Sequence, residues 1–127
     1  MDHTPVHFEI PTNNVEKLKK FYSNLFGWKI EKSQGPLDYW TIETVPVNEQ
    51  MEPLRPGING GMYKSEYQNF KQINYISVEN IDDYIKEVES LGGTIQGEKK
   101  QVPNVGWIAH ALDPEGNPFA MLQPINA

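Results

Sequence analysis

An internal repeat constrains the fold of this chain more than any other feature of its sequence. Adding 66 to a residue number carries one strand–helix segment onto another, and the pairs of positions that coincide are Ile10 and Ile76, Val15 and Ile81, Leu18 and Tyr84, Tyr22 and Val88, Leu25 and Leu91, and Gly27 and Gly93. Two unrelated strand–helix pairs can also look alike, so chance similarity stays open as an alternative. The repeat favours a duplicated supersecondary unit whose two copies bury their apolar faces together.

The first half is predicted to contain a strand, a helix and three further strands. Residues 6–10 alternate apolar and polar side chains, so His7 and Glu9 are expected to share one face of a half-buried strand that Pro11 ends. The paired glycines Gly60 and Gly61 predict a close backbone approach or a bulge. The other expected elements are a helix with the apolar stripe Val15, Leu18, Phe21, Tyr22 and Leu25, capped by Thr12, Asn13 or Asn14 and ended by Gly27, strands at 28–31, 39–45 and 60–63, and a loop over 46–59.

The second half is predicted to begin with another strand and helix and to end in a hairpin. Its expected elements are a strand at 73–78, a cap at Asn80, a helical stripe of Ile81, Tyr84, Ile85, Val88 and Leu91 closed by Gly92 and Gly93, and strands at 106–112 and 118–123 around a turn at 113–117. The length of 127 residues suits a single domain. We therefore expect one α+β domain over 1–127, with module one at about 1–66 and module two at about 67–127.

Composition limits the location and the partners of the chain. The mean hydropathy is −0.59, and no stretch approaches the roughly 20 apolar residues that span a bilayer. The first residues lack the basic and apolar regions of a secretory signal, so we expect a cytoplasmic protein without membrane contact. A net charge of −6 disfavours nucleic acid as a partner. The absence of cysteine excludes disulfides, thiolate metal sites and a cysteine nucleophile.

An ordered set of short motifs covers nearly the whole chain. They are His7-Phe8-Glu9-Ile10, Phe21-Tyr22 with Leu25-Phe26-Gly27-Trp28, Gly60-Gly61, Gly92-Gly93, Val105-Gly106-Trp107 and Asp113-Pro114-Glu115-Gly116-Asn117. In this order they resemble the vicinal oxygen chelate superfamily of glyoxalase, bleomycin-resistance and extradiol dioxygenase proteins, and most closely its lactoylglutathione-lyase-related branch. The resemblance implies two βαβββ modules whose curled mixed sheets enclose a cavity. It also implies a homodimer, in which modules are sometimes exchanged between chains.

The resemblance also implies positions for a divalent metal ion, held in such proteins by His or Glu side chains from the first and last strands of each module. His7 matches the first-strand ligand of module one, but its counterpart 66 residues later is Ile73. The last-strand position of module two falls on Ala120, and the strand 60–63 offers neither a carboxylate nor an imidazole. His7 is then a polar lining or hydrogen-bonded residue rather than a ligand. We therefore predict no metal or other cofactor; a divalent ion held by His7, Glu9 and further ligands is the alternative.

The residues expected to contact a ligand combine apolar bodies with polar ends. They are His7, Glu9, Tyr39, Tyr63, Tyr75, Trp107 and His110. Any one of these aromatic side chains can equally be core filler, and His110 can serve a structural role. Tyr75 stands at the repeat position of Glu9, which places it on the inward face.

Three classes of function remain open. The leading hypothesis is a metal-independent protein that sequesters or senses a small organic molecule, as bleomycin-resistance proteins do, or performs acid–base chemistry with His7 and Glu9 as candidate catalytic residues. The second class is a metal-dependent lyase, isomerase or dioxygenase that uses the same two residues. The third is a structural or protein-interaction domain whose cavity is filled by Tyr39, Tyr75, Trp107 and Leu122.

Overall fold

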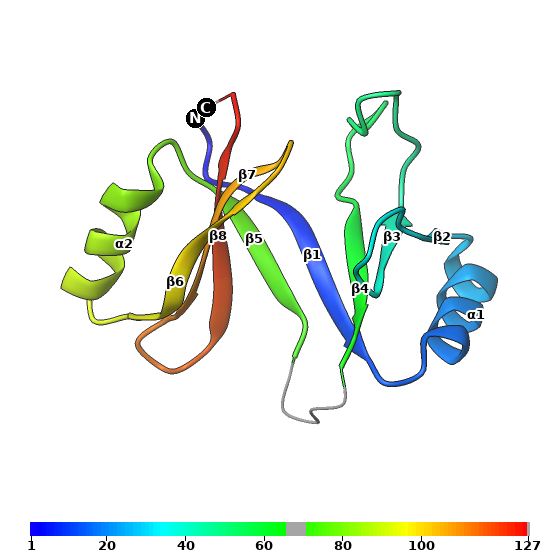
Figure 1. Ribbon diagram of the computed structural model, residues 1–127, viewed down its shortest axis with the longest axis horizontal. Helices are drawn as coiled ribbons and strands as arrows, with labels where there is room; N and C mark the ends of the chain where they lie inside the picture. Colours follow the sequence, from blue (N-terminus) through cyan, green and yellow to red (C-terminus); the bar gives the residue numbers. More distant parts are fainter. Residues whose placement is uncertain (66–70, 127) are drawn as a thin grey trace. The chain divides into compact units, whose positions relative to one another are not determined.

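The computed structural model describes residues 1–65 and 71–126, and it divides the chain into two compact units. One unit is His7–Gln72, which we call the first module, and the other combines Met1–Val6 with Ile73–Ala127, which we call the second module. The module boundary expected near residue 66 lies outside the described residues. Figure 1 shows that each unit has one helix beside its own set of strands.

The first module has a four-stranded mixed sheet in the order β2-β3-β4-β1. Strands β1 and β4 are parallel, whereas the β2–β3 and β3–β4 pairs are antiparallel. The elements are β1 (Pro5–Thr12), α1 (Val15–Phe26), β2 (Lys29–Lys32), β3 (Tyr39–Glu43) and β4 (Gly60–Lys64). Pro11 does not end the first strand as predicted, because β1 continues through Pro11 to Thr12 while paired with β4.

The second module repeats this arrangement in the order β5-β8-β7-β6. Its parallel pair is β5–β8, and the β7–β8 and β6–β7 pairs are antiparallel. The elements are β5 (Ile73–Ser77), α2 (Ile81–Ser90), β6 (Thr94–Val102), β7 (Gly106–Leu112) and β8 (Pro118–Pro124). The predicted α+β class with two βαβββ modules is confirmed, whereas the enclosed cavity stays a prediction.

The two helices begin at repeat-related positions. Asn14 Oδ1 accepts a hydrogen bond from the backbone N–H of Lys17, and Asn80 Oδ1 accepts one from the backbone N–H of Asp83. The donor–acceptor distance is 3.1 Å in both. Each side chain thus satisfies a backbone donor that the first helical turn leaves without an intrahelical partner. Of the three caps expected for α1, Asn14 is the observed one, while the Thr12 hydroxyl accepts from the Asn14 N–H.

The helix ends depart from the repeat. Gly27 closes α1 in the left-handed conformation with φ of 72°, as predicted. In the second module the left-handed residue is Gly92, with φ of 95°, and α2 ends at Ser90. Leu91 therefore lies beyond the helix and is 73% exposed, so its predicted place in the buried stripe is wrong. Gly93 instead allows the chain to pass close to β7, because a β-carbon there would lie 2.8 Å from the carbonyl oxygen of Leu112.

Each module packs its helix against one face of its sheet. In the first module the buried residues are Ile10, Ile30, Ile42 and Met62, with Val15, Leu18 and Tyr22 of α1 packed on them. In the second module they are Val78, Ile81, Ala109 and Met121, with Tyr84, Ile85 and Val88 of α2 packed on them. Phe21 and Leu25 were predicted in the apolar stripe of α1, but they are 55% and 57% exposed. The buried stripe of α1 is therefore narrower than the sequence pattern predicted.

Strand β6 was not among the strands predicted from the residue pattern, although it is nine residues long. Most of its side chains are polar and exposed, since β6 lies at the edge of its sheet and pairs with β7 alone in the second module. Its pairing is also interrupted between Gln96 and Lys100, where Gly97 adopts φ of 72°. Within the described ranges, neither helix has the length and apolar character needed to cross a membrane.

Candidate functional site

The polar side chains predicted on the first strand lie on the side of the first-module sheet opposite α1, which we call the helix-free face. Because side chains alternate along a strand, Phe8 and Ile10 pack toward α1 while His7 and Glu9 point the other way. Glu9 is aligned with Gly61 of β4, and Gly61 with Thr41 of β3. Tyr39 and Tyr63 are aligned in the next row of this face. The sheet thus brings together residues from three separate segments of the chain.

The centre of the helix-free face is the imidazole of His7. Its Nε2 lies 3.2 Å from the Tyr39 hydroxyl and 3.6 Å from Glu9 Oε2. The Glu9 side chain is only 16% exposed and that of His7 is 30% exposed. A bare Nε2 accepts a hydrogen bond from the phenol, whereas the carboxylate at 3.6 Å interacts with a protonated imidazole as an ion pair. His7, Tyr39 and Glu9 therefore form a polar trio around Nε2.

Gly61 makes room for the Tyr39 hydroxyl. A β-carbon at this position would overlap the hydroxyl end of Tyr39 and lie 2.7 Å from Glu9 Oε2. The neighbouring Gly60 is equally confined, since a β-carbon there would lie 2.7 Å from ring carbons of Phe8. The predicted close backbone approach is confirmed at Gly60, which the Phe8 carbonyl oxygen approaches, whereas the groups close to Gly61 are side chains. Nothing in the local pattern indicates that one of them is Tyr39, which lies 22 positions earlier.

Tyr63 extends the same face, and its phenol ionises less readily than usual. Burial raises the pKa of Tyr63 above 10.0, and the negative charge of Glu9 raises this pKa further. The folded state therefore favours neutral Tyr63, and this contribution to stability is complete below the unfolded pKa. It is lost as the pH rises through the higher folded pKa. Tyr63 thus remains a hydroxyl donor at neutral pH.

We expect Glu9→Gln to lower the pKa of Tyr63, because it removes the nearby negative charge but keeps the shape of the side chain. The measurement is the phenolate absorbance titration of the variant and of the unaltered protein, each compared with its own Tyr63→Phe derivative to isolate this residue. Lys29→Gln, on the edge strand β2, is the control and should leave the Tyr63 titration in place. A Tyr63 titration that does not move with Glu9→Gln would contradict the assigned cause.

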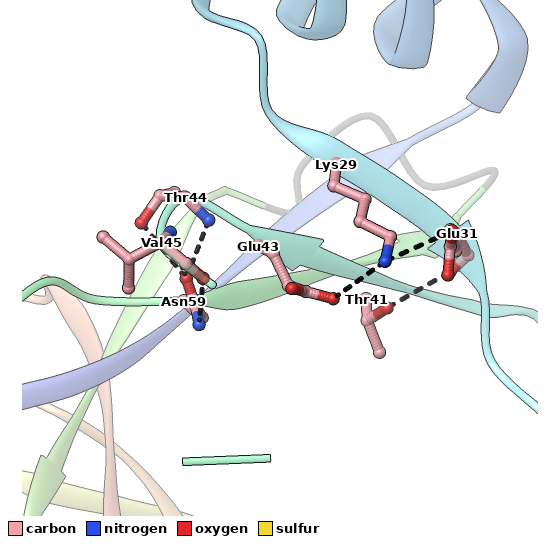
Figure 2. A network of polar contacts seen from close by, with 7 residues as sticks. All are labelled: Lys29, Glu31, Thr41, Glu43, Thr44, Val45 and Asn59. Carbon is pink, nitrogen blue, oxygen red and sulfur yellow. Dashed lines mark hydrogen bonds and ion pairs between the residues drawn. The ribbon is translucent and has the colours of Figure 1, made fainter. Parts of the chain in front are cut away.

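Polar contacts also join β2 and β3 on the helix-free face, as Figure 2 shows. Lys29 Nζ lies 3.7 Å from a Glu31 carboxylate oxygen and 4.0 Å from one of Glu43. The Thr41 hydroxyl donates to the backbone carbonyl of Glu31 over 3.4 Å. Because Lys29 is 60% exposed, its ion pairs contribute little stability, and their main effect is to balance charge beside the site.

Asn59 fixes the chain where it leaves β3. Its Oδ1 accepts from the backbone N–H groups of Thr44 and Val45 over 2.7 and 3.0 Å, and its Nδ2 donates to the Val45 carbonyl over 3.1 Å. The dashed lines of Figure 2 show how this single side chain satisfies several backbone groups. Sequence analysis placed Asn59 in a loop and assigned it no role. It holds the end of the strand that carries Tyr39.

In the second module the matching row contains Tyr75, Ala120 and His110. Tyr75 and His110 are both aligned with Ala120, and their rings meet edge to face with centroids 5.9 Å apart. Tyr75 is only 6% exposed. Trp107 lies on the opposite face, where it packs on the α2-side core with Lys99 Nζ 4.5 Å from its ring centre. Trp107 and His110 differ by an odd number of positions on β7, so alternation separates them.

The residues at the implied metal positions do not fit a complete divalent site. Gly61 and Ala120 occupy equivalent last-strand positions, beside Glu9 and Tyr75 respectively, and neither has a ligating side chain. Ile73 on β5 cannot ligate either. Among residues 1–65 and 71–126 there is no group of three or more His, Asp or Glu side chains placed to hold an ion. His7 and Glu9 supply two donors, fewer than the three protein ligands usual for a catalytic zinc.

Comparison with known proteins identifies relatives over most of the chain. The family model described as Glyoxalase/Bleomycin resistance protein/Dioxygenase superfamily matches residues 4–121. A curated relative, named "Putative glyoxylase CFP32", of Mycobacterium tuberculosis is 25% identical over 124 residues. That alignment covers 94% of this chain but 45% of the relative, so the chain spans about half the length of the curated proteins it matches.

Solved structures share the fold at low sequence identity. A methylmalonyl-CoA epimerase from Mycobacterium tuberculosis is similar with a TM-score of 0.66 and 9% identity, over 94% of this chain and 87% of that one. A glyoxalase/bleomycin resistance protein/dioxygenase superfamily member from Vibrio splendidus has a TM-score of 0.62 and 10% identity, over 94% and 97% of the two chains. At such identities the likeness concerns the fold alone. It confirms the expected glyoxalase-like fold.

Proposed function

Because the chain belongs to the Glyoxalase/Bleomycin resistance protein/Dioxygenase superfamily, we propose that it binds a small organic molecule on the helix-free face of the first module, without a resident metal ion. The observation that carries this proposal is the position of His7 Nε2 between the Tyr39 hydroxyl and the Glu9 carboxylate. The absence of ligating side chains at Gly61, Ile73 and Ala120 supports the metal-independent form.

The chemistry of the face suits a small ligand with both apolar and polar parts. Tyr39 and Tyr63 are half-buried and offer ring surface together with a hydroxyl group. His7 and Glu9 add an imidazole and a carboxylate within hydrogen-bonding reach of a molecule placed over them. On the second module, Tyr75 and His110 offer a similar combination of ring and polar atom.

The same trio can carry acid–base chemistry as an extension of binding. His7 accepts a proton from an acidic group of the ligand, and the Glu9 carboxylate stabilises the resulting imidazolium. Tyr39 competes for the same nitrogen, so its hydrogen bond to His7 re-forms once His7 has passed the proton back to the ligand. Tyr63, neutral at physiological pH, donates a hydrogen bond to a ligand oxygen.

A metabolite screen by thermal shift tests the binding proposal. A ligand that binds the folded state raises the melting temperature, by an amount equivalent to about 2.7 kcal/mol at a concentration 100 times Kd. We expect His7→Asn to abolish most of this shift, because it removes the central imidazole. His3→Asn is the matched control, since His3 contacts Ser77 and Tyr84 in the second module instead. The proposal fails if every stabilising ligand acts equally on the His7→Asn variant.

The competing function is a divalent-metal-dependent lyase, isomerase or dioxygenase, favoured by the 3.6 Å approach of His7 Nε2 to Glu9 Oε2. Titration calorimetry with Zn²⁺, Mn²⁺ and Mg²⁺ separates it from the metal-independent proposal. Stoichiometric, tight binding that Glu9→Gln removes would support the competing function. Weak or absent binding, with the organic ligand still raising the melting temperature, supports the metal-independent site.

A further inference from the structure

The outward side of α1 exposes two large apolar side chains among lysines. An open groove of about 590 Å³ is lined by Lys17, Leu18, Lys20, Phe21, Asn24 and Leu25. Phe21 and Leu25 are more than half exposed and lie one helical turn apart, so their side chains form a continuous stripe. Two exposed apolar side chains are too little surface to mark a contact site by themselves, so the charges around them decide what they can bind. We call Lys17, Lys20, Phe21 and Leu25 the α1 stripe.

The repeat places an acidic counterpart on α2. Adding 66 carries Lys17 to Asp83, Phe21 to Glu87 and Leu25 to Leu91, and these three residues are exposed. Leu91, just beyond the helix, is 73% exposed. We call Asp83, Glu87 and Leu91 the α2 stripe. Both stripes therefore end in an exposed leucine, but they carry charges of opposite sign.

The charge difference extends over the whole of both helices. Helix α1 contains three lysines and one glutamate, whereas α2 contains four acidic residues and one lysine. A basic surface is unusual in a chain whose net charge is −6. Asp82 is bonded to Lys99 over 2.8 Å within the chain, but no such ion pair is seen for Asp83 or Glu87 among the described residues. The charges of the α2 stripe are thus accessible to another molecule.

We propose that the α1 stripe binds the α2 stripe of a second copy of this chain. With the two helices side by side and running in the same direction, Lys17 faces Asp83, Lys20 faces Glu87, and Leu25 with Phe21 covers Leu91. An antiparallel arrangement would instead set Leu25 against Asp83 and Lys17 against Leu91. The parallel register is therefore the one that satisfies charge and apolar contact together. This proposal is independent of the ligand site around His7.

Sedimentation velocity of the full chain over a range of concentrations tests this contact. We expect concentration-dependent self-association whose Kd rises roughly fivefold to tenfold in Lys17→Asp or in Asp83→Lys, because each change sets like charges opposite each other. Combining the two changes restores the attraction with its sign exchanged, so the Kd should return toward that of the unaltered chain. Lys100→Asp, which alters an exposed lysine on β6, is the matched control.

A second variant keeps the test independent of charge. Phe21→Ser removes apolar contact from the α1 stripe and should raise the Kd by roughly tenfold, while circular dichroism shows that the helix is retained. Three outcomes would overturn the proposal: a monomer at every concentration, an oligomer that none of the stripe variants weakens, and single charge changes whose effects add in the double variant instead of cancelling. Binding of the α1 stripe to anionic vesicles without self-association would also reject it.

Discussion

Alanine at position 61 will force the Tyr39 hydroxyl away from His7 Nε2. The added β-carbon would occupy the space of that hydroxyl and lie 2.7 Å from Glu9 Oε2. Gly61 is buried on β4, between the paired strands β1 and β3, so the backbone has little freedom to move away. Overpacking of this kind costs about 1–3 kcal/mol of unfolding free energy. We therefore expect Gly61→Ala to destabilise the first module and to disrupt the trio around His7.

Urea unfolding and the NMR signals of the His7 ring measure the two effects of Gly61→Ala separately. Tyr39→Leu is the informative partner, because it removes both the hydroxyl and the ring carbon Cζ that the new β-carbon would meet. In the double variant the cost of the alanine should be smaller than in the single one, a coupling that a double-mutant cycle detects. Unchanged stability and unchanged His7 signals in Gly61→Ala would contradict the prediction. They would show that the Tyr39 hydroxyl keeps its position without the space that a glycine leaves.

Ile42→Ala should have the largest effect on stability among the changes considered. Ile42 is 1% exposed and packs with Ile10, Ile30 and Met62 on the α1 side of the first-module sheet. Truncating a fully buried isoleucine removes transfer free energy and leaves a cavity, at a cost of about 2–5 kcal/mol. Strand β3 carries Ile42 on one face and Tyr39 with Thr41 on the other, so we also expect weaker ligand binding.

Chemical unfolding of Ile42→Ala beside Leu37→Ala checks this expectation. Leu37 is 73% exposed, and its truncation should change the unfolding free energy by less than about 0.5 kcal/mol. Equal losses in the two variants would mean that the packed face of β3 contributes no more than the surface does. A loss of unfolding free energy confined to Ile42→Ala would show that the stabilising core lies between α1 and the sheet.

Local sequence signals predicted most of the elements, because their causes lie within a few residues. Asn14 and Asn80 precede the helices they cap, and Gly27 supplies the left-handed residue that ends α1. The alternation around His7 and Glu9 correctly placed them on one face of β1. The failures have local reasons too: Leu91 continues the helical spacing although α2 ends at Ser90, and β6 is an edge strand with too few apolar residues to be recognised.

The site itself could be predicted only in part. The sequence named His7, Glu9, Tyr39 and Tyr63 as candidates, but it did not indicate which of them meet. Tyr39 reaches His7 because β4 lies between β3 and β1 and contributes a glycine where a side chain would intervene. The same periodicity placed Phe21 and Leu25 in the buried stripe of α1, whereas the sheet covers a narrower part of the helix and leaves them exposed.

The sequence alone determined the duplicated strand–helix units, the helix caps and the lack of ligating side chains at Ile73 and Ala120, since each is a property of residue type and spacing. Only the tertiary structure decided that the Tyr39 hydroxyl approaches His7 Nε2 from another strand. Strand order and register are set by packing among segments distant in the chain, and a contact across three strands follows from that packing rather than from any local pattern.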